Sequence, residues 1–222
     1  MTERLLLVRH GVTTWNREGR FQGRMDAPLA EEGRLEARLL GQRLAAEREP
    51  MLLVTSPLRR ARDTADIIAR ALEQDPRELA DDERLVEIGQ GEWEGRTHDE
   101  LARTEPERYA AWATTDREPP GAEPIPDALR RVTRALDDLG SADAPGVCLV
   151  SHGGILRLVA RYLLRMDAAR AWAMDVDNAS LSELRRDDGP DAWRLVRWND
   201  TAHLLGRTEQ HVDEAEGRPL AL

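Results

Sequence analysis

Three short apolar runs are spread along the chain, and each stops abruptly at polar residues. They cover residues 5–8, 51–54 and 147–150. Apolar runs of this length that end in this way are typical of buried β-strands. Between and after them, the sequence pattern predicts helices at about 31–48, 58–72, 97–114, 126–139 and 155–166. Strands that alternate with helices predict an α/β fold, in which a mostly parallel sheet is covered by helices on both faces.

The remaining segments are assigned from their turn residues. Residues 11–30 contain three glycines and a proline, and residues 115–126 contain four prolines, so both segments are expected to be loops. Near the end of the chain, two strand-like segments at 179–186 and 192–198 flank the polar stretch 187–190. This arrangement predicts a β-hairpin.

Composition and charge narrow the class of protein. The chain has 222 residues, of which 41% are hydrophobic and 33% charged, and this fits one globular domain with a sizeable core. No apolar run approaches the roughly 20 residues that span a bilayer, and the first run is too short for a secretory leader, so a cytoplasmic protein is expected. The formal net charge of −10 argues against a broad nucleic-acid-binding surface. Because Cys148 is the single cysteine, the sequence excludes an internal disulfide and a CxxC metal site.

Polar groups suited to chemistry follow all three predicted strands. Arg9-His10-Gly11 ends the first strand, residues 56–60 follow the second, and Ser151-His152-Gly153 ends the third. In sheets of this kind, ligands lie at the carboxyl ends of the strands. We therefore expect two histidines and at least two arginines around one ligand. That ligand is an anion, because a guanidinium offers paired donors to phosphate or carboxylate and opposes a cation.

This environment favours phosphoryl transfer, which depends mainly on positioning and charge stabilisation. Arg59 or Arg60 is expected to project from the first turn of a helix, where free N–H groups also attract an anion, and the helix after Gly153 repeats this arrangement. His10 is a candidate nucleophile, base or metal ligand, and as a nucleophile it would form a phosphohistidine. Glu87 is a candidate for the acid that protonates the leaving group, and the alternative is a solvated loop carboxylate.

Four motifs, in their order and spacing, resemble the histidine phosphatase superfamily, whose founders are the cofactor-dependent phosphoglycerate mutases. The first motif begins at Leu6, includes Arg9-His10-Gly11 and continues to Gly33. The other three are Ser56-Pro57-Leu58-Arg59-Arg60-Ala61, Arg84-Leu85-Val86-Glu87-Ile88-Gly89 and Val150-Ser151-His152-Gly153-Gly154. The resemblance covers residues 4–205 and is specific, because four separate motifs match in order.

The resemblance implies a role for each matched residue. His10 would be the residue that is phosphorylated, and Glu87 would protonate the leaving group and then help to activate water. The phosphoryl group would be bound by Arg9, Arg59 and His152, and the same pocket would be lined by Asn16, Gln22, Gly23 and Gly153. The resemblance implies that no metal and no cofactor is needed.

The resemblance also implies a fold. We expect a three-layer α/β/α sandwich, phosphoglycerate mutase-like, in one domain over residues 1–206, followed by a polar tail at 207–222. A small helical cap insertion at about 90–128 would lie over the site. Within it, Trp93, Trp112 and Arg117 either face the substrate, pack inside the cap or stay in solvent. Family members are monomers or homodimers, so either state is expected here.

The expected activity is that of a metal-independent phosphomonoesterase acting on a small phosphorylated metabolite, with phosphoglycerate mutase as the runner-up. Glu92 and Glu94 follow the candidate acid and would repel a bisphosphoglycerate, which favours the phosphatase. Two other hypotheses stay open. One is a non-catalytic phosphate-binding protein on the same fold. The other is a metallohydrolase with the two histidines and Glu87 as ligands, which the neighbouring arginines would oppose.

Overall fold

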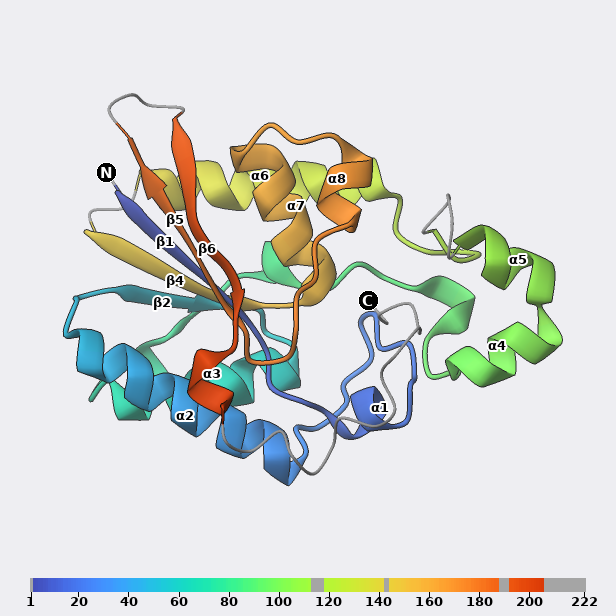
Figure 1. Cartoon of the computed structure of the whole chain (residues 1–222), viewed down its shortest axis with the longest axis horizontal. Helices are drawn as coiled ribbons and strands as arrows, with labels where there is room; N and C mark the ends of the chain where they lie inside the picture. Colours follow the sequence, from blue (N-terminus) through green and yellow to red (C-terminus); the bar gives the residue numbers. More distant parts are fainter. Residues whose placement is uncertain (1, 113–117, 142–143, 188–191, 206–222) are drawn as a thin grey trace.

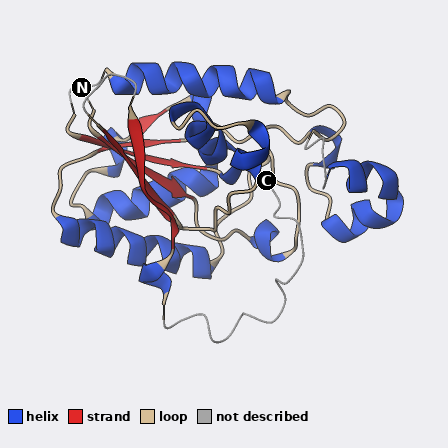
Figure 2. Ribbon diagram, turned by 45° about the horizontal axis from the view of Figure 1, so that its top comes forward, coloured by secondary structure: helices blue, strands red, loops and turns tan. Residues whose placement is uncertain are grey.

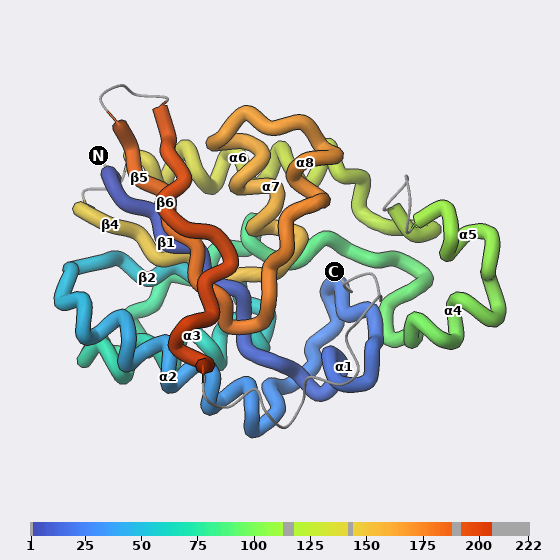
Figure 3. The backbone as a smooth tube through the Cα atoms, viewed as in Figure 1, coloured from blue at the N-terminus to red at the C-terminus, as the bar shows by residue number. Residues whose placement is uncertain are grey.

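The computed structural model describes residues 2–112, 118–141, 144–187 and 192–205. Within these residues, six strands form one sheet in the order β3-β2-β4-β1-β5-β6 (Figure 1, Figure 3). The strands are β1 (Arg4–Arg9), β2 (Leu52–Thr55), β3 (Ala80–Asp81), β4 (Gly146–Ser151), β5 (Leu181–Arg186) and β6 (Trp193–Asp200). The four strands β3, β2, β4 and β1 run parallel, whereas β5 pairs antiparallel with β1 and with β6. The three predicted strands and the predicted hairpin are confirmed.

Helices cover both faces of this sheet, which makes the predicted three layers (Figure 2). One face carries α2 (Glu31–Glu47) and α3 (Arg59–Ala71). The other carries α6 (Ile125–Gly140) and α7 (Gly153–Leu163), and α8 (Ala168–Trp172) packs beside α7. The helix expected at 155–166 begins at Gly153, so Gly153 and Gly154 belong to its first turn.

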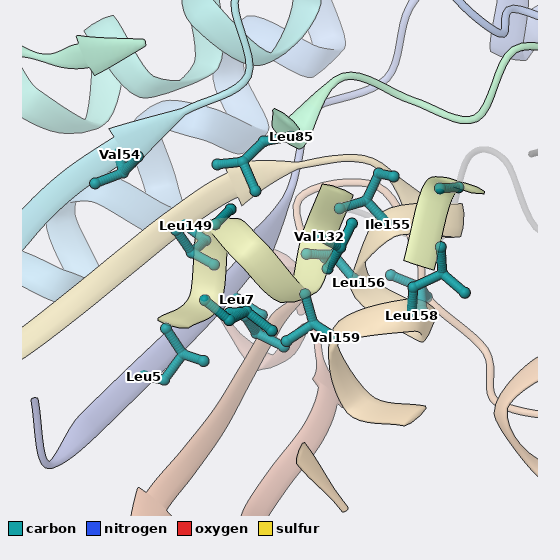
Figure 4. Close-up of a cluster of buried hydrophobic side chains, with 14 of the residues drawn as sticks. Leu5, Leu7, Val54, Leu85, Val132, Leu149, Ile155, Leu156, Leu158 and Val159 are labelled. Carbon is teal, nitrogen blue, oxygen red and sulfur yellow. The ribbon is translucent and has the colours of Figure 1, made fainter. Parts of the chain in front are cut away.

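Alternating side chains of the central strands fill two separate cores. Leu5 and Leu7 of β1 pack with α6 and α7, and Figure 4 shows Leu7 beside Val159. Leu6 and Val8 point to the opposite face and pack with α2 and α3. The period of two residues in a strand explains this division, and it explains why β1 and β4 are apolar at every position between their ends.

Two short helices, α4 (His98–Thr104) and α5 (Pro106–Ala111), lie away from the sheet (Figure 1). The sequence pattern predicts one helix over 97–114, but Pro106 cannot donate a backbone hydrogen bond and starts a new helix instead. Trp93 and Trp112 are each 1% exposed and pack with Phe21, Leu101 and Tyr109 in a small core of their own. Both tryptophans are therefore buried in this core, which also includes Phe21 from outside residues 90–128, whereas Arg117 lies outside the described residues.

Shorter elements complete the described chain. They are the helix α1 (Thr14–Arg17) and the 3₁₀ turns η1 (Pro76–Glu78), η2 (Glu83–Leu85), η3 (Gly91–Trp93) and η5 (Ala202–Leu204). None of the described helices is long and apolar enough to cross a membrane. The predicted tail at 207–222 lies outside the described residues.

Candidate active site

The predicted residues His10 and His152 meet at the carboxyl edge of the sheet. Parallel pairing aligns Arg9 at the end of β1 with Ser151 at the end of β4, and the His10 amide donates to the Ser151 carbonyl at 3.0 Å. The two imidazole rings that follow have centroids 5.2 Å apart. Both side chains are buried, with exposed fractions of 2% and 0%. The strand register therefore brings together two groups that are 142 positions apart in the sequence.

The surroundings of His10 suit a nucleophile. Its Nδ1 lies 2.8 Å from the Gly11 carbonyl oxygen, which can only accept, so Nδ1 carries the proton. Burial, and then the nearby Arg60 and Arg9 charges, hold the pKa of His10 well below its usual range. His10 is therefore neutral, and its Nε2 has a free lone pair.

The protonation of His152 follows from the same reasoning. The Arg60 Nε–H donates to Nδ1 of His152 at 3.2 Å, so Nδ1 carries no proton. Nε2 therefore carries the proton and donates to the Ser56 hydroxyl at 2.8 Å. Burial, and then the charge of Arg60, lowers the pKa of His152 well below its usual range. Both imidazoles are neutral, and their hydrogen-bond partners determine the tautomer of each.

Arg60, rather than Arg59, is the arginine that α3 places in the site. Arg60 is 1% exposed, and besides His152 it donates to the Gly23 and Met25 carbonyls at 2.7 Å each. Burial lowers its pKa to about 10. The Arg59 side chain is 61% exposed and lies 3.8 Å from Asp63 on the next turn.

The expected position of Arg59 is therefore corrected. Successive helical residues are rotated by about 100°, so two adjacent arginines cannot face the same side. The buried face of α3 consists of Arg60, Ala61, Thr64, Ala65, Ile68 and Ala69. Apart from Arg60, the residues of this face are small or apolar, as expected for a buried helix face. The position of Arg60 on the same face therefore identifies it as the arginine that points inward.

Arg9 offers a donor that the described part of the chain leaves unused. Its Nη1 donates to the Val176 carbonyl at 2.6 Å, but its buried Nε has no hydrogen-bond partner among the described residues. The guanidinium lies against the first turn of α7, with Nε 3.7 Å from the point that a Cβ on Gly153 would occupy. A buried cationic donor beside a helix N-terminus is a strong attractor for an oxyanion.

Glu87 is buried at the same helix end, so it is not a solvated loop carboxylate. It is 2% exposed, and its oxygens accept from the Ile88 amide at 2.8 Å and from the Gly154 amide at 3.2 Å. A Cβ on Gly154 would stand 2.6 Å from Glu87 Oε1. A glycine at this position therefore lets the carboxylate approach the backbone of α7.

Asn16 and Gln22 are oriented by one hydroxyl group. Thr13 Oγ1 lies 2.9 Å from Asn16 Oδ1 and 3.0 Å from Gln22 Oε1, and the Thr13 amide also donates to Asn16 Oδ1 at 3.1 Å. Because the amide oxygens face Thr13, the NH₂ groups are the parts left to bind a phosphoryl oxygen. Gly23, the next residue, has a φ of 49°, in the left-handed region that glycine adopts without strain.

Glu94 has a structural role that the sequence does not reveal. Its Oε1 accepts from the backbone amides of Arg24 at 3.0 Å and Gln90 at 2.9 Å. It therefore braces two loops, whereas Glu92 is exposed to solvent. The expected repulsion of a bisphosphoglycerate by Glu92 and Glu94 stays a prediction.

Two further residues, to which the sequence analysis gives no role, support the site. Asn178 Nδ2 donates to the His10 carbonyl at 3.0 Å, and Arg157 Nε donates to the Met174 carbonyl at 2.8 Å. Together with the bond from Arg9 to Val176, they hold the segment 174–178 against His10. The signal for Arg157 is its position in the apolar α7, where a buried arginine needs a specific partner.

Because the pKa of His10 is lowered, we predict that the protein becomes less stable as the pH falls. Below pH 6.5 the unfolded chain binds a proton at this residue and the native protein does not, so the free energy of unfolding decreases as the pH falls. The expected slope is roughly 1.4 kcal/mol per pH unit for each such histidine. His152 contributes to this slope in the same direction. His203 does so as well, because burial also lowers its pKa.

Urea unfolding at pH 7, 6 and 5 measures this slope. In the variant His10→Gln the side chain cannot titrate. We therefore expect its free energy of unfolding to depend less steeply on pH, by the contribution of His10. A slope that is the same in the variant and the wild-type protein would contradict the prediction.

Comparison with known proteins shows similarity over most of the chain. The family model of the histidine phosphatase superfamily (branch 1) matches residues 5–201. Phosphoglycerate mutase-like protein 4 of Arabidopsis thaliana is 33% identical over 207 residues, which cover 90% of this chain and 86% of that protein. Phosphoserine phosphatase 1 of Hydrogenobacter thermophilus is 32% identical over 204 residues, which cover 90% and 94%.

A solved structure has the same fold. It is that of mycobacterial glucosyl-3-phosphoglycerate phosphatase in complex with VO3, with a TM-score of 0.79 and 32% identity. The match covers 89% of this chain and 99% of the other. The similarity thus includes all the strand ends that carry the candidate site.

Proposed function

The chain belongs to the histidine phosphatase superfamily and is a phosphoric monoester hydrolase of small phosphorylated metabolites, and we propose that it acts through a phosphohistidine on His10. The observation that carries the proposal is the convergence of two neutral imidazoles and two buried guanidiniums at one edge of the sheet. One of these guanidiniums, that of Arg9, keeps a buried Nε donor unused within the described chain.

The first step transfers the phosphoryl group to the enzyme. The lone pair of His10 Nε2 attacks phosphorus while the bond from phosphorus to the ester oxygen breaks. Glu87, in its protonated form, donates a proton to the departing alkoxide. The products are an alcohol, a phosphohistidine and the Glu87 carboxylate.

The second step returns the enzyme to its starting state. The Glu87 carboxylate takes a proton from a water molecule, whose oxygen attacks phosphorus as the bond to Nε2 breaks. Inorganic phosphate leaves, and Glu87 is protonated again. Its position at the first turn of α7 is compatible with both steps, because the Gly154 contact holds the carboxyl group beside the same helix end as Arg9.

Charge on the moving phosphoryl group would be stabilised by fixed donors. Arg9 and Arg60 supply guanidinium N–H groups, and the first turn of α7 supplies backbone N–H groups. Asn16 and Gln22 would add their oriented NH₂ groups. These donors are held by hydrogen bonds before the substrate arrives, so little reorganisation is needed during the reaction.

A mutase remains the alternative activity, because one relative is named phosphoglycerate mutase-like. The two activities differ in the fate of the phosphoryl group, which a phosphatase passes to water and a mutase returns to its substrate. No observation on this chain favours the mutase, and the phosphatase names among its relatives favour hydrolysis.

The experiment that tests the function is a phosphate-release assay on a panel of phosphomonoesters. We expect release from several small metabolites, with the same rate in excess chelator, since Arg9 and Arg60 beside His10 would repel a divalent cation. Among the described residues, no three His, Cys, Asp or Glu side chains cluster so as to hold a metal ion. Loss of activity in chelator, or efficient conversion of 3- to 2-phosphoglycerate without phosphate release, would contradict the proposal.

Three expectations stay predictions. They are the action of residues 90–128 as a cap over the site, the monomeric or dimeric state, and the cytoplasmic location.

A further inference from the structure

Residues 22–26, which we call the rim loop, hold Arg24 beside the buried site. The carbonyl oxygens on both sides of Arg24, those of Gly23 and Met25, accept from the Arg60 guanidinium at 2.7 Å each. The Arg24 amide N–H donates to Glu94 Oε1 at 3.0 Å. These bonds fix the backbone of Arg24 next to Arg60, and only its side chain is left to move.

The Arg24 side chain extends to the segment that carries Glu87. Its Nε lies 3.7 Å from the point that a Cβ on Gly89 would occupy, and its Nη2 lies 3.1 Å from Glu123 Oε1. The Glu123 amide in turn donates to the Gly89 carbonyl at 2.9 Å. Arg24 is nevertheless 50% exposed. It therefore reaches from the Arg60 side of the site to the Glu87 side with a guanidinium that solvent can contact.

Glu123 does not depend on Arg24 for a partner. Arg131 donates to both of its oxygens, at 2.8 Å each, and the Glu123 side chain is only 13% exposed. A second carboxylate could therefore bind the exposed Arg24 while Glu123 keeps its paired bonds to Arg131. Such an exchange replaces one carboxylate by another on the same planar donor, so it costs little free energy.

We propose that Arg24 binds a carboxylate of the substrate and makes this enzyme selective for small phosphorylated carboxylic acids. The inference rests on the proposed phosphatase function, in which Arg9 and Arg60 are occupied by the phosphoryl group. Arg24 is then an exposed cation whose backbone is bonded beside Arg60 and whose side chain reaches the segment that carries Glu87. A carboxylate fits this position, because Arg24 offers a planar pair of donors and already pairs with the Glu123 carboxylate.

Other described charged groups near the rim loop have partners within the chain. Arg59 lies along α3 beside Asp63, at 3.8 Å. The Asp26 carboxylate accepts from the Arg59 amide at 2.9 Å. Glu94 accepts from two backbone amides. Among the described residues, the contacts therefore favour Arg24 as the specificity-determining residue.

The test compares substrates that differ only in the carboxylate. Phosphoserine and phosphoethanolamine form one such pair, and 3-phosphoglycerate and glycerol 3-phosphate form a close second. We expect wild-type protein to prefer the acid in at least one pair. Arg24→Gln should then lower kcat/KM for the acid by roughly tenfold or more, mainly through KM, and leave the partner without the carboxylate nearly unchanged. Arg24→Lys should restore part of the preference, and Arg59→Gln is the matched control on the same rim.

The outcomes separate the two proposals. An equal loss on both members of a pair would show that Arg24 only supports the rim loop, and no change on either would show that it does not contact the substrate. Either result overturns the inference and leaves the phosphatase intact. If the wild-type protein releases phosphate from no member of any pair or of the wider panel, the proposed function itself fails.

Discussion

His10→Ala is expected to lose phosphate release by roughly four to six orders of magnitude, the loss typical when a covalent nucleophile is removed. The physical reason lies in the hydrogen bonds of the two imidazoles of the site. Among the described residues, these bonds leave one imidazole lone pair unused, and it is on Nε2 of His10. The measurement is steady-state phosphate release, together with a search for the acid-labile phosphoenzyme after rapid quenching. The fold should survive, because within the described part of the chain the imidazole makes one side-chain hydrogen bond, to its neighbour Gly11.

Glu87→Gln is the control that separates attack from proton donation. It should reduce turnover of alkyl phosphates strongly, but p-nitrophenyl phosphate should still form the phosphoenzyme, since its leaving group needs no proton. His10→Ala should fail to form it from either substrate. Activity of His10→Ala near that of the wild-type protein would show that the mechanism is wrong.

Arg60→Ala and Arg59→Ala are expected to differ sharply although they change adjacent residues. Loss of Arg60 removes a buried guanidinium that contacts His152, and it should lower kcat by at least about a hundredfold, as for the loss of one fixed donor to a developing charge. Loss of Arg59 removes an exposed side chain beside Asp63 and should change kcat little. Phosphate release at saturating substrate measures both.

Arg60 also joins α3 to the rim loop by hydrogen bonds. A second variant is therefore needed to separate this structural role from the effect on catalysis. Arg60→Lys keeps the charge but cannot donate to Gly23, Met25 and His152 together, and it should regain only part of the lost rate. Thermal unfolding of all three variants shows whether they are folded. If Arg59→Ala proved the more damaging change in folded protein, the assignment of Arg60 to the site would be incorrect.

Much of the fold could be predicted because its signals are local. The buried strands β1, β2 and β4 are short apolar runs that end in polar residues, and such runs need no knowledge of the rest of the chain. Their polar ends then locate His10 and His152, since the carboxyl ends of parallel strands meet at one edge. The two-residue strand β3 is too short to give any periodic signal.

The details that sequence reasoning missed depend on orientation or on distant contacts. Arg59 and Arg60 have the same chemistry, and only the buried face of α3 distinguishes them. Glu94 accepts from the amide of Arg24, which is 70 positions away in the sequence, so nothing near Glu94 indicates its bracing role. The break between α4 and α5 has a local signal in Pro106, which the expectation of one continuous helix did not use.

The pairing of β1 with β4 has a consequence for how the enzyme becomes active during folding. Arg9 stands opposite Ser151 only when two strands that are 142 positions apart in the sequence have come together, and long-range pairing of this kind is slow. A shift by one residue would turn the His10 side chain toward the opposite layer of helices. Enzymatic activity therefore requires this pairing, and its recovery after dilution from denaturant is expected to follow the pairing of β1 with β4.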